Sequence, residues 1–236
     1  MKPDCHFYSL DLKTLVETIE SRCQAGVKHQ RRIGEIWSAC IFTLCLEHHE
    51  GKRFLISFPE RGSKPAQASV EDLMAGKVGE LDDWDIVLIP DLGPDGPAER
   101  EFYPYQLVSY RRRENPSTED LINFLEEKKL KKASGGDLAL VVHLEQETPF
   151  RFDWVKVAIH LMMRRPKCPY QQVFMLGEFG DPEKPYWQCR QMFPLMLPMQ
   201  NLDRESARRL VQDRPTYPTT ERMPANPGNS ERSYRP

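Results

Sequence analysis

The chain has 236 residues, 39% of them hydrophobic, and a formal net charge of −2 at pH 7. This length suits one substantial domain, and the near-neutral charge gives no global argument for nucleic-acid or membrane binding, so such a partner would need a local patch. The N-terminus lacks the apolar core of a signal peptide, and no apolar run approaches the ~20 residues of a membrane span. Six dispersed cysteines without a CxxC pair favour reduced thiols. We therefore expect a cytoplasmic protein that is not inserted in a membrane.

The first half of the chain predicts two helices followed by three strands. Apolar residues at helical spacing predict helices over 11–24 and 30–48, and the apolar stripe of the second helix is too wide for an exposed helix. Compact apolar runs predict strands over 53–58, 85–89 and 102–111. Turn-forming residues separate these strands, which could form a meander.

The segment 135–147, GGDLALVVHLEQE, predicts the central strand of the sheet. Its residues Leu138 to Val142 are apolar without alternation, which is typical of a strand with both faces covered. Predicted helices flank it over 117–132, where Ser117 is the expected N-cap, and over 152–164.

The last part of the predicted domain contains strands over 170–176 and 186–193, the second of them edge-like. After Leu202 the composition turns polar and rich in proline, and only 204–212 could form a short helix. The sequence therefore predicts a single α/β domain over residues 1–202, with a mixed β-sheet flanked by helices. A mostly disordered C-terminal tail is expected over residues 203–236.

The order helix, three strands, helix and strand over residues 30–146 resembles the core of the restriction-endonuclease-like fold, the superfamily of PD-(D/E)xK nucleases. That family places an Asp on the second strand of the core and a Glu/Gln-x-Lys motif on the third. Asp85 matches the first position and Gln106 could match the second. Val108 stands where the family has its lysine, so the resemblance implies a degenerate site unless Lys128, from the following helix, supplies a displaced lysine.

Two interpretations of the acidic position remain open. In an active nuclease, Asp85, Gln106 and Lys128 would form the catalytic site, and Asp85 would bind Mg²⁺, which prefers hard oxygen ligands and activates a water molecule. Alternatively, Asp85 and the other carboxylates near it are solvated or cap local turns. In that case no cofactor is expected.

Two further groups of residues could bind a ligand. Arg111, Arg112 and Arg113 form a basic run at a strand end that could hold a phosphate backbone, although acidic residues nearby also fit an ordinary solvated surface. His143 and Glu145 should project to the same face of the central strand, at its carboxyl end, where open α/β sheets often build sites. They could supply a base or a metal ligand, or only satisfy hydrogen bonds.

Three functions fit these observations. The first is a nuclease-like fold with a degenerate site, acting as a regulatory module or binding nucleic acid. The second is an active Mg²⁺-dependent nuclease. The third is a component that binds another protein, or has a structural role, without chemistry.

Overall fold

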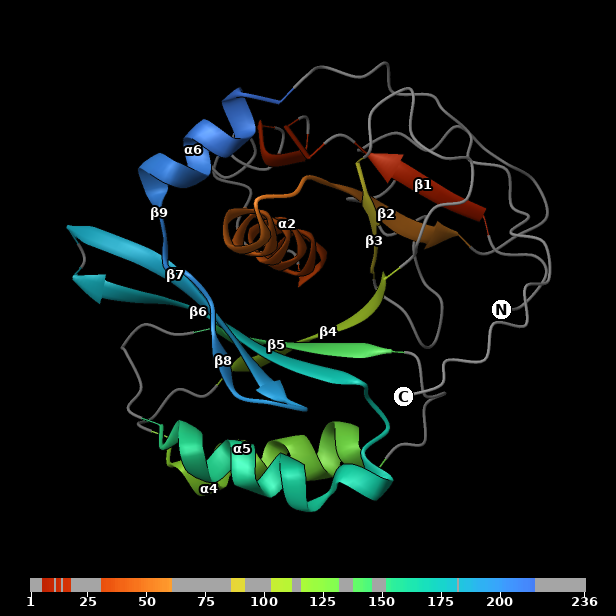
Figure 1. Ribbon diagram of the computed structural model, residues 1–236, viewed down its shortest axis with the longest axis vertical. Coiled ribbons are helices and arrows are strands. Elements are labelled where there is room, and N and C mark those ends of the chain that lie inside the picture. The colour runs from red at the N-terminus through yellow and green to blue at the C-terminus, as the bar shows by residue number, and fades with distance from the viewer. Residues whose placement is uncertain are drawn as a thin grey trace.

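A computed structural model describes residues 6–10, 12–13, 15–17, 31–60, 86–91, 103–111, 116–131, 138–145, 152–181 and 183–214. They confirm the predicted α/β class with a mixed sheet and flanking helices (Figure 1). The helices are α2 (Arg31–Glu50), α4 (Thr118–Leu125), α5 (Trp154–Met163) and α6 (Arg204–Gln212), and α4 continues into a π-helical turn (Glu126–Leu130). The strands are β1 (His6–Leu10), β2 (Phe54–Glu60), β3 (Ile86–Pro90), β4 (Tyr103–Arg111), β5 (Ala139–Glu145), β6 (Gln172–Asp181), β7 (Lys184–Phe193), β8 (Leu197–Pro198) and β9 (Leu202–Asp203).

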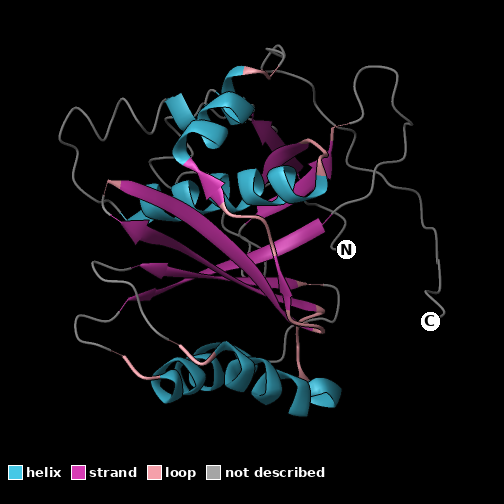
Figure 2. Cartoon of the chain, turned by 60° about the vertical axis from the view of Figure 1, so that its left-hand side comes forward, coloured by secondary structure: helices cyan, strands magenta, loops and turns pink. Residues whose placement is uncertain are grey.

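The described strands form one sheet in the order β1 to β8, and the short β9 also pairs with β7. Neighbours from β1 to β4 are antiparallel, so the predicted meander of β2, β3 and β4 is confirmed. The strands β4, β5 and β6 are parallel, and β7 returns antiparallel to β6. The two parallel connections run through α4 and α5, which therefore cover the same face of the sheet. Figure 2 shows these two helices as a layer on one side, with α2 and α6 on the other.

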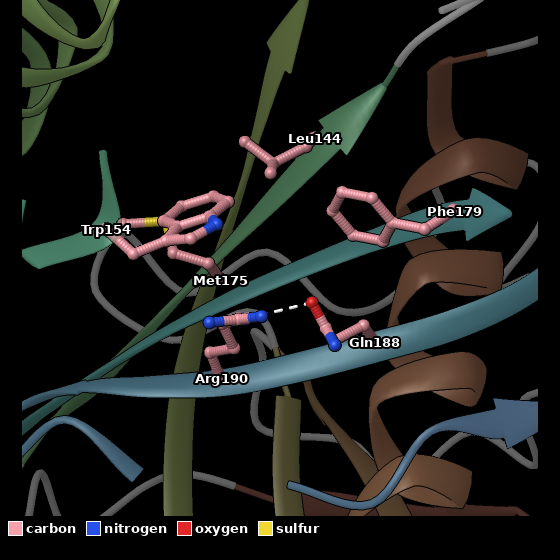
Figure 3. Close-up of a pocket in the computed structure, with 6 residues that line it drawn as sticks. All are labelled: Leu144, Trp154, Met175, Phe179, Gln188 and Arg190. Carbon is pink, nitrogen blue, oxygen red and sulfur yellow. Dashed lines mark hydrogen bonds between the residues drawn. The ribbon is translucent and has the colours of Figure 1, made fainter. Parts of the chain in front are cut away.

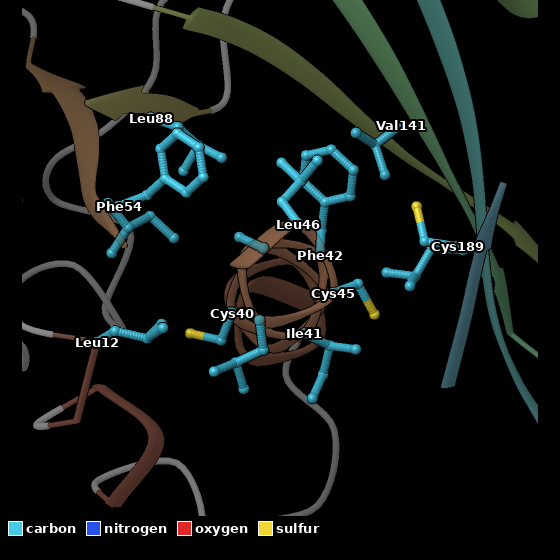
Figure 4. Packing of buried hydrophobic residues seen from close by; sticks show 14 of the residues in the cluster. Leu12, Cys40, Ile41, Phe42, Cys45, Leu46, Phe54, Leu88, Val141 and Cys189 are labelled. Atoms are coloured by element: carbon cyan, nitrogen blue, oxygen red, sulfur yellow. The ribbon is translucent and has the colours of Figure 1, made fainter. Parts of the chain in front are cut away.

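The helix α2 lies inside the curl of the sheet (Figure 1). Its residues from Ile36 to Glu47 are buried except Trp37, which is partly buried. This confirms the prediction that a helix with so wide an apolar stripe is not exposed. Figure 4 shows side chains such as Phe42 and Cys45 extending from several sides of the helix toward the surrounding strands. The ring of Phe42 packs edge-on against Tyr105 and Phe174, with centroid distances of 5.0 and 5.2 Å.

The predicted position of the central strand is confirmed, because β5 lies between β4 and β6. Its side chains alternate between two hydrophobic clusters. Ala139 and Val141 belong to the cluster around α2, whereas Leu140, Val142 and Leu144 pack with α4 and α5. All five are buried, so each face of the strand is covered.

The folded body continues beyond Leu202, the residue after which the sequence predicted the tail. Ala207 and Val211 of α6 are buried, and Arg214 is buried in an ion pair with Glu47 at the end of α2. The short strands β1, β8 and β9 were not predicted. In the predicted helix over 11–24, residues 12–13 and 15–17 are described and helical, and the rest lies outside the described residues. No described helix is long and apolar enough to cross a membrane.

Candidate functional site

The predicted site residues that the structure describes lie on opposite faces of the sheet. Gln106 is the register partner of Leu140, and partners on parallel strands direct their side chains to the same face. Gln106 therefore faces α4 and α5. His143 and Glu145 share the α2 face with Val141, as the sequence predicted for the pair. The two groups cannot form one site.

On the α4 and α5 face, the amide oxygen of Gln106 accepts a hydrogen bond of 2.7 Å from the phenol of Tyr170. Val108, two residues further on the same face, packs partly buried against the apolar cluster of α4 and α5. Lys128 is exposed in the π-helical turn after α4. Asp85 lies outside the described residues. The described part of this site therefore offers an amide oxygen that already has a donor, and an apolar side chain two residues further on.

The carboxyl ends of β4 and β5 bring a second set of predicted residues together. The parallel register places Arg111 beside Glu145 and Ser109 beside His143. All four lie on the α2 face, at the edge where parallel strands end, which is where the sequence predicted a candidate site. Arg112 and Arg113 follow Arg111 in the chain and lie outside the described residues.

A hydrogen-bond chain from α2 fixes the tautomer of His143. The hydroxyl of Ser38 lies 2.7 Å from the carbonyl oxygen of Gly34 and 2.8 Å from Nδ1 of His143. The carbonyl can only accept, so the single hydroxyl proton of Ser38 goes to Gly34, and Nδ1 of His143 must donate to the hydroxyl oxygen. The proton of the neutral ring therefore sits on Nδ1, and Nε2 carries the free lone pair.

Burial keeps this imidazole neutral. It lowers the pKa of His143 below its ordinary value, against the opposing attraction of the carboxylates of Glu145 and Glu178. Oε1 of Glu145 lies 4.0 Å from Nδ1 of His143, too far for a hydrogen bond. Of these two polar neighbours only Ser38 forms a hydrogen bond with His143, a contact that no pattern in the sequence indicates. Nε2 can accept a proton or a hydrogen bond, but Ser38 is not an activated nucleophile because its proton is held by Gly34.

A small cavity lies on the other face of the sheet, beside the start of α5 (Figure 3). The Arg190 guanidinium stands 5.7 Å from the ring centroid of Trp154 and donates a hydrogen bond of 2.9 Å to Gln188. Leu144, Met175 and Phe179 complete the lining, and these side chains leave essentially no room for even a water-sized molecule. Pockets for small molecules usually measure ~300–1,000 Å³, so this cavity is too small for such a ligand.

The described residues contain no group of three His, Cys, Asp or Glu side chains that could hold a metal ion. Cys40 and Cys45 are buried on α2, and burial raises the pKa of each thiol to about 12, so both act as packing residues rather than as reactive thiols. Comparisons of the chain with protein-family models, curated proteins and solved structures find no match.

Proposed function

We propose that the protein is a non-catalytic binding or regulatory module built on a restriction-endonuclease-like core, and that its ligand is nucleic acid. The observation that carries the non-catalytic part is the third strand of that core. Val108 occupies the position of the family's lysine and packs against α4 and α5, while Gln106 is engaged by Tyr170. A valine cannot orient an attacking water or stabilise charge on a phosphate, so this strand lacks the polar groups that cleavage requires.

The connectivity supports the choice of core. The helix α2 precedes three antiparallel neighbours, β2, β3 and β4, and α4 then crosses to β5, which runs parallel to β4. This is the element order on which the resemblance rests. The helix before the meander and the crossover helix also cover opposite faces of the sheet (Figure 2).

The carboxyl end of β4 is the best candidate surface for a phosphate backbone. Arg111 is exposed there, and the next two residues in the sequence are Arg112 and Arg113. Neighbouring cations attract phosphates independently of base sequence and release counterions on binding, so affinity falls as salt rises. Glu145 beside Arg111 opposes this attraction, and we therefore expect modest affinity with a clear salt dependence.

Fluorescence anisotropy with labelled duplex DNA, single-stranded DNA and RNA over a series of NaCl concentrations tests this proposal. We expect binding that weakens with salt, and the substitution Arg111→Glu should lower affinity and reduce the magnitude of the log–log salt slope by about 1, or somewhat less. Lys131→Glu is the matched control, since it reverses an exposed cation in the segment after α4, and it should leave binding unchanged. Absence of salt-sensitive binding to all three probes would remove nucleic acid as the ligand and leave the protein-interaction hypothesis.

A further inference from the structure

The helix α5 exposes an apolar stripe although its other side is packed on the sheet. Of the eight exposed large hydrophobic side chains among the described residues, four lie on this helix: Val155, Ile159, Met162 and Met163, at 55%, 54%, 36% and 80% exposure. Val155, Ile159 and Met163 are spaced by four residues and therefore follow one side of the helix. Exposed apolar groups gathered in one place, unlike single ones, mark a surface that binds a partner.

The exposed side of α5 is self-complementary about Ile159. In two antiparallel copies whose Ile159 residues face each other, Val155 of one copy faces Met163 of the other, since each lies four positions from Ile159. Asp153 and Arg165 lie six positions away on either side, so the acidic residue of one copy faces the basic residue of the other. Both are exposed. A parallel arrangement would instead place like charges together.

The neighbouring helix α4 extends this polarity. It runs in the same direction as α5, because Thr118 contacts Asp153 at their first turns and Glu126 contacts His160 and Arg164 near their ends. The N-terminal end of this two-helix layer carries Glu119, Asp120 and Asp153 and one cation, Lys156, which pairs with Glu119. Its C-terminal end carries one exposed acid, Glu127, and the exposed cations Lys128, Lys131, Arg165 and Lys167. An antiparallel pairing of two layers therefore brings ends of opposite sign together.

We propose that two copies of this chain associate through α5 as an antiparallel helix pair about a two-fold axis at Ile159. A two-fold interface uses the same patch on both copies and must be complementary to itself, which the pattern of charge and apolar residues along α5 satisfies. The contact centres on one helix of each copy, so the interface is small and the dimer is reversible. Salt screens the attraction between the charged ends and therefore weakens the dimer. This interface is separate from the strand end proposed to bind nucleic acid.

Sedimentation of the full chain over a range of concentrations tests the dimer. The wild type should change from monomer to dimer as concentration rises. Ile159→Glu places two carboxylates against each other at the axis and should leave only monomer, and Met163→Glu should weaken the dimer through a different position. Leu197→Glu is the matched control, because it changes an apolar side chain of similar exposure, 49%, outside α5. Circular dichroism melts verify that each variant is folded.

Cysteine pairs test the orientation. With oxidised glutathione as the oxidant, a mixture of the Val155→Cys and Met163→Cys variants should give more covalent dimer than either variant alone, with the wild type as the background for the native thiols. Preferential cross-linking of each variant to itself would indicate parallel helices and overturn the proposed arrangement. A wild type that stays monomeric, or a dimer that survives both Ile159→Glu and Met163→Glu, would overturn the interface itself.

Discussion

Replacement of Arg214 by methionine should be one of the most destabilising single changes in the folded body. The guanidinium of Arg214 forms an ion pair with Glu47, and the two side chains are 4% and 2% exposed. Methionine fills space but carries no charge, so the carboxylate of Glu47 would stay buried with the amide of Phe54, at 2.7 Å, as its remaining donor. Breaking a buried ion pair from one side costs about 3–5 kcal/mol, a large part of the ~5–15 kcal/mol by which domains are usually stable.

This loss should depend on pH in a direction that the structure determines. Burial raises the pKa of Glu47 above its ordinary value of 4.5, and Arg214 is the main opposing influence. Without Arg214 the pKa of Glu47 rises further. Between the ordinary and the raised pKa the native variant then binds a proton that the unfolded chain does not, so its stability increases as the pH falls. The deficit relative to the wild type should be largest at neutral pH and shrink in mild acid.

Urea titrations followed by circular dichroism, at neutral pH and in mild acid, measure both effects. The double variant Glu47→Leu with Arg214→Met should recover most of the lost stability, because no buried charge remains. A chain ending at Gln212 should be destabilised like Arg214→Met, whereas one ending at Tyr217 should match the wild type. A loss within about 0.5 kcal/mol for Arg214→Met, the usual range for surface substitutions, would refute the structural role of the pair.

Three further predictions concern the packing and the candidate site. Leu140→Ala, in the fully buried centre of β5, should cost about 2–5 kcal/mol in a urea titration, while Glu127→Ala, on the exposed turn after α4, should stay within about 0.5 kcal/mol; equal losses would contradict the burial of β5. Glu126→Ala should cost about 1–3 kcal/mol in the same titration, because Glu126 is only 12% exposed and pairs with His160 of α5 and with Arg164 at the end of that helix. His143→Gln should flatten the decline of stability between about pH 7 and pH 5. In that range the unfolded chain takes up a proton on His143 that the native ring does not, because the pKa of the native ring is lowered. The wild type should therefore lose at most about 1.4 kcal/mol of stability per pH unit through this residue as the pH falls. An unchanged pH profile in His143→Gln would argue against a neutral buried ring.

Local patterns were sufficient for several elements. Ser117 was predicted as a helix cap from its neighbours, and its hydroxyl does accept from the backbone of Asp120 at 3.2 Å. The apolar run of β5 and the wide stripe of α2 indicated burial because covering both faces of a strand, or most sides of a helix, leaves a continuous apolar signal.

Contacts between distant segments could not be predicted in this way. Ser38 and His143 are 105 residues apart, and Glu47 and Arg214 are 167 apart, so no local spacing connects either pair. The strands β8 and β9 have two residues each, too few to carry a periodicity. Alternation along β5 correctly placed His143 and Glu145 on the same face of the strand. The face occupied by Gln106 depends instead on the register between β4 and β5, which the sequence of a single strand does not contain.

Cleavage of nucleic acid is the measurement that tests the proposed loss of nuclease activity most directly. The purified wild type and its Asp85→Ala variant should be incubated in parallel with linear duplex DNA, single-stranded DNA and RNA, in the presence of Mg²⁺ or Mn²⁺. Val108 stands where the proposed resemblance would place a lysine, and Gln106 is engaged by Tyr170, so we predict that the wild type cleaves no faster than the variant. Metal-dependent cleavage by the wild type that Asp85→Ala abolishes would contradict this prediction. If the separate variant Lys128→Ala also lost that cleavage, Lys128 would be identified as a displaced catalytic lysine.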